Sequence, residues 1–420
     1  MGQSQGASPY IPANREIDVK ALVYERNIAR FAATKIVGLV ANPRAALSPL
    51  RILEKDAPEL PGEDWVRFYP KLSGICGSDL ATITSNSSRY LEDFVSFPFV
   101  MGHEVLGEYL AADGSMQRAV LIPSLNCEVR GTEPKCRFCE SGHPQRCQLL
   151  NIGTISTGLQ TGYCQDTSGG WSQELVAHRA QLFDIPKTFS DEDAVLLEPF
   201  SCAVHAAMSI GNNLNTQVAV IGSGTLGLLT IAALRAIHPN AEIIATAKYP
   251  HQKELALQFG ATTVSAANEL YRQARAIRSA QMIASDKPTD GFGIVFDAVG
   301  SSSTIEQALK VAAPGADVIL VGMPKEQKID LTPLWMKEIS IKGSYAYGTE
   351  TLESEKVSTF ELAARFAPGI GLSKLLSATY RLDDFEKAID HALNAGRRGS
   401  VKIAFDMRKG QNRESWSQKQ

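Results

Sequence analysis

The sequence lacks any apolar run long enough to cross a membrane, and its start lacks the pattern of a secretion signal. A spanning helix needs ~18 apolar residues in succession, whereas the early apolar stretch from Lys35 to Val40 is interrupted by Gly38. Residues Met1 to Asn14 contain no basic segment followed by an apolar core and are rich in Gly, Ser, Gln and Pro. We therefore expect no membrane partner, a cytoplasmic location and a loose N-terminal arm over residues 1–18.

Neither sign of charge is in excess. Lys and Arg number 42 against 45 Asp and Glu, for a net charge of -3, so the chain has no basic field that would attract nucleic acid. Hydrophobic residues make up 44% of the chain and charged residues 21%, which is the profile of an ordinary globular protein. A chain of 420 residues exceeds one typical core, so we expect two domains and no nucleic-acid partner.

The first part of the chain consists of short β-type runs separated by Gly, Pro and Ser. Examples are Ala21 to Tyr24, Trp65 to Tyr69 and Ala119 to Ile122, which indicate a β-rich domain of hairpins and loops. The pattern then changes. Gln217 to Ile221 is a continuous apolar run, typical of a strand buried on both faces, and a helical pattern follows from Thr225 to Ile237.

This alternation predicts an α/β fold with a doubly wound parallel sheet of six strands. The five further strand candidates are Glu242 to Thr246, Thr262 to Ser265, Gly293 to Ala298, Asp317 to Gly322 and Ile339 to Gly343. After Tyr345 the sequence predicts a helix (Thr351 to Phe366), a second helix (Leu382 to Ala395) and a strand (Val401 to Phe405), before a frayed tail beyond about Met407. We assign 199–345 to the sheet domain, and 19–198 with the returning segment 346–420 to the β-rich domain.

The segment Gly222-Ser223-Gly224-Thr225-Leu226-Gly227 has the G-x-G-x-x-G pattern between a buried strand and a helix. In that position Gly222 permits the tight turn, Gly224 lets a pyrophosphate approach the backbone, and Gly227 allows close helix packing. The helix N-terminus then offers unpaired N–H groups to the phosphates. The alternative is a plain strand-to-helix turn.

Four of the seven cysteines, Cys127, Cys136, Cys139 and Cys147, fall within 21 positions. Without an export signal, such a cluster favours a metal over disulfides. Four thiolates around a C-x-x-C core suffice for a closed structural zinc site. The alternative, four buried free thiols, fits poorly with the charged residues between them.

A second group of candidate ligands is dispersed. It comprises Cys76 in Gly74 to Asp79, His103 next to Glu104, and Glu198 in Leu197 to Phe200. Sulfur, nitrogen and oxygen ligands from separate segments are typical of a catalytic zinc with an open position. From spacing alone, His103 beside Glu104 is better explained as an ordinary surface or core pair than as metal ligands.

Taken together, these strings resemble the zinc-dependent medium-chain alcohol dehydrogenase family, in particular its threonine and polyol dehydrogenase-like members. The segments Gly74 to Asp79, Gly102 to Glu104, the cysteine lobe and Gly222 to Gly227 have the order and approximate distances of that family. The resemblance runs from about Ala21 to Phe405. It implies a Rossmann domain combined with a GroES-like catalytic domain.

The resemblance also implies roles for individual residues. Cys76, His103 and Glu198 would bind the catalytic zinc, with Glu104 or water as a further, exchangeable ligand. Ser78 would take the proton of the substrate alcohol, and Asp79 would orient the ligands. Two features depart from the family pattern: Cys127 lies six positions earlier than usual, and Ala81 replaces a relay histidine.

The cofactor residues implied by the resemblance are Gly222, Gly224, Thr225, Leu226, Gly227, Lys248, Tyr249, Val299, Val321 and Lys402. NAD-specific members of this fold carry an acidic residue after the second strand, where this chain has Ala247 followed by Lys248. We therefore expect NADP to be preferred, with NAD possible. The alternative is that Lys248 is a solvated lysine and either cofactor serves.

The function expected from the resemblance is hydride transfer between NAD(P) and an alcohol or carbonyl substrate held on zinc, in a homodimer or homotetramer. One alternative is a zinc-free reductase of the same architecture, although such relatives lack the cysteine lobe and the Cys and His ligands. Another is a non-catalytic protein that keeps the fold and its ligands. The substrate is not evident from the sequence, because it depends on loops such as Ala81 to Val100 and Ile152 to Gln173. Trp171, Tyr345 and Tyr347 are candidate lining residues, although isolated aromatic residues more often belong to a core.

Overall fold

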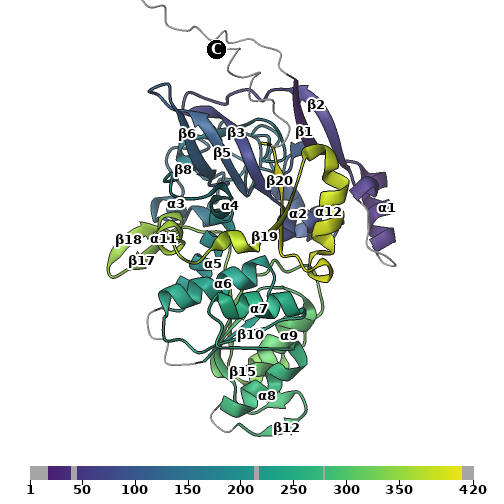
Figure 1. Cartoon of the computed structure of the whole chain (residues 1–420), viewed down its shortest axis with the longest axis vertical. Helices are drawn as coiled ribbons and strands as arrows, with labels where there is room; N and C mark the ends of the chain where they lie inside the picture. The colour runs from purple at the N-terminus through teal and green to yellow at the C-terminus, as the bar shows by residue number, and fades with distance from the viewer. Residues whose placement is uncertain (1–17, 39–44, 212–216, 278–279, 409–420) are drawn as a thin grey trace, which may run out of the picture.

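The computed structural model describes residues 18–38, 45–211, 217–277 and 280–408. Nearly all of the expected arm and tail lies outside these residues. Within them, no helix is both long and apolar enough to cross a membrane. Figure 1 shows a β-rich domain in the upper half of the view and a domain of alternating helices and strands below it.

The β-rich domain is built on a seven-stranded sheet and a small three-stranded sheet. The larger sheet has the order β19-β20-β3-β5-β6-β8, and β7 also pairs with β3; the smaller has the order β2-β1-β4. Their bounds are β1 Asp18–Tyr24, β2 Leu50–Asp56, β3 Trp65–Gly74, β4 Phe99–Val100, β5 Val105–Leu110, β6 Met116–Leu121, β7 Leu175–His178, β8 Leu182–Asp184, β19 Leu376–Tyr380 and β20 Lys402–Asp406. The sheets bury the short apolar runs that the sequence shows in this region.

Short helices connect these strands. They are α1 Ile28–Gly38, α2 Gly77–Ile83, α3 Arg137–Glu140, α4 Asp191–Ala194 and α12 Phe385–Leu393. Helix α2 begins directly after Cys76, where the chain leaves β3, and the Asp79 side chain accepts a hydrogen bond from the Cys76 N–H at 2.9 Å. This local cap fixes the first turn that carries the proposed catalytic residues.

The second domain contains the predicted doubly wound sheet. Its order is β11-β10-β9-β14-β15-β16, and all neighbours pair in parallel. The strands are β9 Val218–Ile221, β10 Ile243–Thr246, β11 Thr263–Ser265, β14 Phe292–Asp297, β15 Ala312–Leu320 and β16 Ser340–Gly343. The strand order reverses between β9 and β14, which is where such folds bind a dinucleotide.

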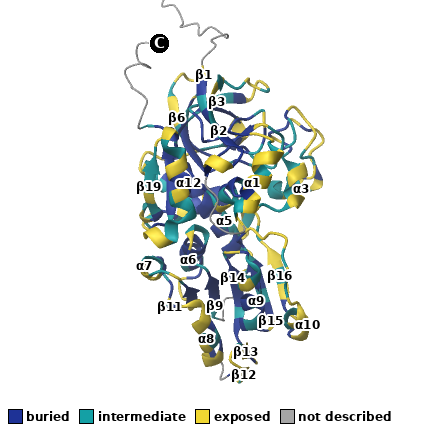
Figure 2. Cartoon of the chain, turned by 90° about the vertical axis from the view of Figure 1, so that its right-hand side faces the viewer, coloured by how far each residue is buried: buried dark blue, intermediate teal, exposed yellow. Residues whose placement is uncertain are grey.

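Helices cover both faces of this sheet, because alternate strand residues point to opposite sides. Val218 and Val220 pack toward α6 Thr225–Ile237 and α7 Pro250–Gln258. Ala219 and Ile221 pack toward α8 Leu270–Ala276 and α9 Ser302–Val311. Figure 2 shows β9, β14 and β15 in dark blue, with exposed residues on the outer side of helices such as α8 and α10 Thr332–Met336. A small hairpin, β12 Met282–Ala284 and β13 Lys287–Pro288, lies at the far end.

The chain then returns to the first domain, but the predicted helix from Thr351 to Phe366 is wrong over its first half. That half forms a hairpin of β17 Thr349–Leu352 and β18 Glu355–Ser358, followed by α11 Thr359–Phe366. Glu353 and Ser354 adopt left-handed φ angles of 48° and 75° at the turn, which a helix cannot contain. The Ser358 side chain accepts a hydrogen bond from the Glu361 N–H and begins the helix.

Helix α5, Leu197–Met208, lies at the junction of the two domains and contacts both α6 and α11. One buried cluster includes Leu72 and Val120 of the β-rich domain, Phe200 of α5, and Val220 of the parallel sheet. The expected domain boundary after Glu198 falls inside this helix. The first turn of α5 therefore lies where the two domains share a core.

Candidate metal and cofactor sites

Cys76, His103 and Glu104 form one cluster of candidate metal ligands. They come from the start of α2 and from the segment just before β5, yet one ligand atom of each lies within 4.8 Å of the others. His103 and Glu104 are buried and Cys76 is partly buried. A thiol, an imidazole and a carboxylate thus meet at one point beside the shared core.

Asp79 contacts two residues of this cluster, Cys76 and His103. The Asp79 carboxylate is fully buried; one oxygen accepts the Cys76 N–H, and the other lies 3.4 Å from Nδ1 of His103. Burial alone would lower the pKa of His103, but Asp79 and the nearby Cys76 hold it well above its ordinary value. The contact at Nδ1 leaves Nε2 as the ring nitrogen available to a metal.

Glu104 also has a buried partner, Lys402 at the start of β20. The Lys402 ammonium forms an ion pair with Oε2 of Glu104, and the two side chains are 3% and 2% exposed. Burial would lower the pKa of Lys402, but the Glu104 charge raises it above the usual value. We expected Lys402 to bind the cofactor. In the structure its ammonium instead pairs with a carboxylate of the candidate zinc cluster.

Glu198 lies apart from this three-residue cluster, in the first turn of α5. It is 6% exposed. Burial raises its pKa to about 7, and the charges of His103 and Glu104 act on it in opposite directions. The Glu198 oxygens are not among the atoms that meet within 4.8 Å, although the cluster's charges act on its pKa. The Cys202 sulfur lies one helical turn further along α5, 3.9 Å from Oε1 of Glu198.

The four cysteines of the lobe, Cys127, Cys136, Cys139 and Cys147, are brought together as predicted, with their sulfurs within 4.8 Å of one another. The Sγ atoms of Cys127 and Cys147 are 3.6 Å apart. The segment after Cys127 forms a loop that is closed by an ion pair between Glu128 and Lys135. Despite the unusual spacing, the Cys127 sulfur therefore lies beside the other three.

Proton affinities differ within the lobe. Burial opposes ionisation of Cys136, but backbone N–H groups, among them that of Cys139, lower its pKa to about 6. Burial raises the pKa of Cys147 to about 11 and raises that of Cys139 further. A metal bound by all four thiolates must therefore displace protons from the less acidic thiols.

The glycine loop has the geometry expected of a pyrophosphate site. Gly222 has a φ of 95°, and its N–H donates to Thr246 Oγ1 at 2.9 Å. A Cβ at Gly224 would meet nothing within 4 Å, whereas one at Gly227 would collide with the Gly222 carbonyl. The open side at Gly224 and the start of α6 at Thr225 are what a phosphate needs.

The remaining predicted cofactor residues lie at the carboxyl ends of the same strands. Lys248 is exposed just after β10, with its Nζ 5.6 Å from the centre of the Tyr249 ring. Val299 follows β14 and is exposed, whereas Val321 follows β15 and is buried. The Asp297 carboxylate accepts the Val299 N–H at 2.9 Å and fixes this loop.

Two matched family models agree with this architecture. Residues 62–187 match the alcohol dehydrogenase GroES-like domain, and residues 225–361 match the zinc-binding dehydrogenase model. An L-threonine 3-dehydrogenase of Pectobacterium carotovorum is 28% identical over 360 residues, covering 85% of this chain and 96% of its own length. The chain belongs to the zinc-dependent medium-chain alcohol dehydrogenase family.

Solved structures share the fold of this dehydrogenase family member. An L-idonate 5-dehydrogenase from Escherichia coli K-12 has a TM-score of 0.67 at 20% identity, over 93% of this chain and 99% of its own. A putative zinc-binding dehydrogenase from Sinorhizobium meliloti 1021, solved with NADP, has a TM-score of 0.68 at 21% identity, over the same shares. At these identities the likeness concerns the fold alone.

Tyr163 is a residue of the candidate site that the sequence did not indicate. Its hydroxyl donates to Asp79 Oδ1 at 3.1 Å and lies 3.4 Å from Thr82 Oγ1. Burial and the charge of Asp79 raise the pKa of Tyr163 well above 10, so the hydroxyl keeps its proton. Tyr163 lies 84 positions from Asp79, within the loop expected to shape the substrate pocket, and no local pattern marks it.

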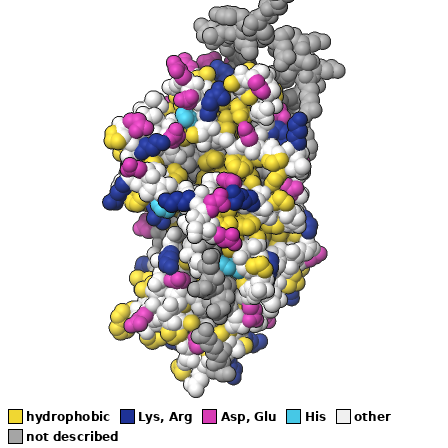
Figure 3. All heavy atoms as spheres, turned by 90° about the vertical axis from the view of Figure 1, so that its left-hand side faces the viewer, with side chains coloured by type: hydrophobic (Ala, Val, Ile, Leu, Met, Phe, Trp, Pro, Cys, Tyr) yellow, Lys and Arg dark blue, Asp and Glu magenta, His cyan; other side chains and the backbone are white. Residues whose placement is uncertain are grey.

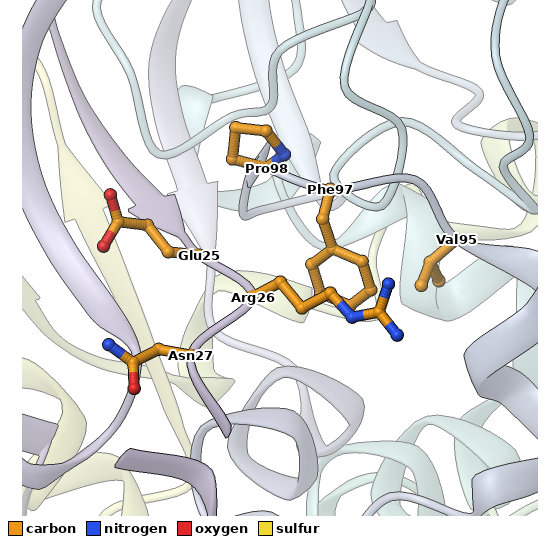
Figure 4. A pocket seen from close by; sticks show the side chains of 6 residues that line it. All are labelled: Glu25, Arg26, Asn27, Val95, Phe97 and Pro98. Carbon is orange, nitrogen blue, oxygen red and sulfur yellow. The ribbon is translucent and has the colours of Figure 1, made fainter. Parts of the chain in front are cut away.

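The candidate pocket aromatics of this dehydrogenase occupy different environments. Trp171 is fully buried and donates to the Gly74 carbonyl, and Tyr347 is also in the core, whereas Tyr345 is 52% exposed. Two pockets instead involve the segment 81–100. One, of about 540 Å³, is lined by residues 25–27 with Val95, Phe97 and Pro98, as Figure 4 shows.

Proposed function

We propose that this protein is a zinc-dependent dehydrogenase that transfers hydride between NADP, or less favourably NAD, and an alcohol or carbonyl substrate. The observation that carries the proposal is the meeting of Cys76, His103 and Glu104 beside the shared core, whose helix α5 carries Glu198 in its first turn. A reductase that works without zinc has no need of these ligands, and a binding protein has no need of an open metal site.

The residues fit zinc at both clusters. A thiolate, an imidazole and a carboxylate are the donors of catalytic zinc, and four thiolates are those of structural zinc. We assign the first site to Cys76, His103 and Glu198, with Glu104 as an alternative to water, and the second to the cysteine lobe. Zinc bound at the first site would supply a Lewis acid for the substrate oxygen.

The protein's own contribution is positioning and proton transfer. Asp79 holds the Cys76 backbone and the His103 ring in place. Ser78, one residue earlier in α2 and partly buried, is our choice for the group that takes the proton of the alcohol. Gly222 to Gly227 would hold the pyrophosphate of the dinucleotide, and the substrate would then bind on the β14 and β15 side of the sheet.

The proposal is tested by replacing one ligand. Cys76→Ser should remove one zinc per chain and lower turnover by several orders of magnitude, because the Lewis acid is lost. Metal content and formation of reduced cofactor would be measured with polyols, hydroxy amino acids and simple alcohols. Cys164→Ser is the control, since Cys164 is a buried free thiol that belongs to neither cluster.

Two outcomes would contradict the proposal. Full turnover in Cys76→Ser would show that this cluster does not carry the reaction. A native protein that binds dinucleotide and zinc yet oxidises no alcohol in the panel would favour the non-catalytic alternative.

A further inference from the structure

We infer that the substrate carries an anionic group, a phosphate or a carboxylate, which binds in a cationic pocket beside the proposed catalytic site; the inference rests on the proposed function. The cationic pocket has a volume of about 450 Å³ and is lined by Lys35, residues 85–89 and residues 325–328. These segments come from α1, from the loop after α2 and from the loop after β15. Both domains thus contribute to it.

The pocket concentrates positive charge. Lys35, Arg89, Lys325 and Lys328 line it, against a single carboxylate from Glu326, although the whole chain carries a net charge of -3. Within the described part of the chain, Arg89, Lys325 and Lys328 form no ion pair. Like charges gathered around one hollow repel one another, and an anion bound among them relieves that repulsion.

Hydrogen bonds connect the pocket to the proposed catalytic residues. Ser87, in the pocket wall, lies with its Oγ 3.1 Å from Thr82 Oγ1. The Thr82 hydroxyl donates to the carbonyl of Ser78 at 3.0 Å. Thr82 is one helical turn from Ser78, a rise of ~6 Å. Thr82 thus links the pocket wall to the backbone of Ser78, and the inferred anionic group lies at the end of the substrate remote from the reacting carbon.

The phosphates of the cofactor do not account for this charge. The glycine loop follows β9, and Lys248 follows β10, so the pyrophosphate and a 2′-phosphate belong to that half of the sheet. Residues 325–328 follow β15, on the opposite side of β9. Gln327 ties this loop to the end of β14 by donating to the Gly300 carbonyl at 3.0 Å. The pocket therefore lies on the nicotinamide half, where the substrate binds.

The donors in the pocket suit a terminal phosphate best. Arg89 offers a planar fork of N–H groups, and the lysines offer point charges. Asn86, Ser87 and Ser88 add neutral donors from the same loop. A carboxylate has fewer acceptor sites and a smaller charge, so it should respond in the same direction but more weakly. A neutral polyol gains nothing from the four cations.

The test compares three substrates that differ only at the end remote from the reacting carbon: a polyol, its terminal phosphate ester and the matching terminal carboxylic acid. The double variant Lys325→Gln/Lys328→Gln removes two of the cations. We expect the native enzyme to have the highest kcat/KM for the phosphate ester. In the variant, the ratio of kcat/KM for the phosphate ester to that for the neutral polyol should fall roughly 10- to 100-fold, mainly through KM. Lys356→Gln, at an exposed lysine of β18, should leave the ratio unchanged.

Calorimetric binding of the phosphate ester to the zinc-loaded protein with NADP gives a readout that does not need turnover. Binding that the double variant loses supports the inference, even if no substrate in the panel is oxidised and the proposed function fails. If the neutral polyol is oxidised as efficiently as its phosphate ester, the inference is overturned while the proposed function stands. Equal binding of the phosphate ester to native protein and variant, or no binding to either, also overturns it.

Discussion

At the scale of single residues, Tyr163 joins a loop of no regular structure to the proposed zinc ligands through Asp79. Its hydroxyl donates to the carboxylate oxygen that also faces His103, and its ring packs on Phe99 with centroids 5.2 Å apart. Removing the hydroxyl leaves the ring in place but removes one support of Asp79. Tyr163 is thus a positioning residue rather than a ligand.

We therefore expect Tyr163→Phe to weaken zinc binding at the proposed catalytic site roughly 10- to 100-fold, as is usual when a partner of a metal ligand is removed. Competition with a chelator, with zinc content and turnover measured together, would show the loss. The exposed Tyr90 provides the control Tyr90→Phe. Unchanged zinc affinity in Tyr163→Phe would mean that Asp79 holds the ligands without this hydrogen bond.

The choice of cofactor also depends on single residues. Ala247 and the exposed Lys248 follow β10, where an NAD-specific enzyme carries a carboxylate. A charge-assisted contact of Lys248 with a 2′-phosphate contributes about 1.5 to 3 kcal/mol, or roughly 10- to 100-fold in affinity. Lys248→Ala should therefore weaken NADP more than NAD, and Ala247→Asp should reverse the preference.

Fluorescence titration with both reduced cofactors would check this prediction. Lys253→Ala, at an exposed lysine further along α7, is the matched control and should change neither affinity. Equal or tighter binding of NAD by the unmodified protein would contradict the assignment of Lys248 without affecting the zinc sites.

At the scale of elements, the sequence predicted those strands and helices whose formation depends on adjacent residues. The apolar run ending at Ile221 and the helix from Thr225 to Ile237 match β9 and α6 closely, because burial on both faces and helical periodicity are properties of adjacent residues. The clustering of the four cysteines was likewise predictable, since it depends on one short lobe.

The features that the sequence did not predict depend on turn conformation or on contacts between residues distant in sequence. The helix predicted from Thr351 includes the hairpin turn at Glu353 and Ser354, whose left-handed backbone no apolar periodicity shows. A better signal was available, because Ser358 with Glu361 has the spacing of a capping box. The pairing of Lys402 with Glu104 spans nearly 300 positions, so the sequence alone suggested only a cofactor contact.

The cysteine lobe supplies the prediction at this scale. Cys139→Ser should remove the proposed structural zinc and lower the free energy of unfolding, because metal binding contributes directly to the stability of such a lobe. For a domain of roughly 150 to 250 residues, the Tm falls by about 2 to 4 °C for each kcal/mol lost. Calorimetry with metal analysis would check both effects; loss of zinc with an unchanged Tm would contradict a structural role.

At the scale of the whole molecule, the site depends on both domains being held together. Helix α5 contributes Glu198 and packs in the core that both domains share. Cys76 and His103 precede this helix in the chain, and the glycine loop follows it. The face in Figure 3 shows Lys and Arg interspersed with Asp and Glu.

The most direct test of the account is the zinc content of the full-length protein, measured together with its turnover. We expect two zinc ions per chain, because the all-thiolate cluster and the mixed cluster are chemically distinct and separate in the fold. A chelator should remove the zinc of the mixed site first, abolishing turnover while the far-ultraviolet circular dichroism stays unchanged, and added zinc should restore activity. A protein with fewer than one tightly bound zinc per chain, or one that keeps its turnover after losing that zinc, would contradict the account.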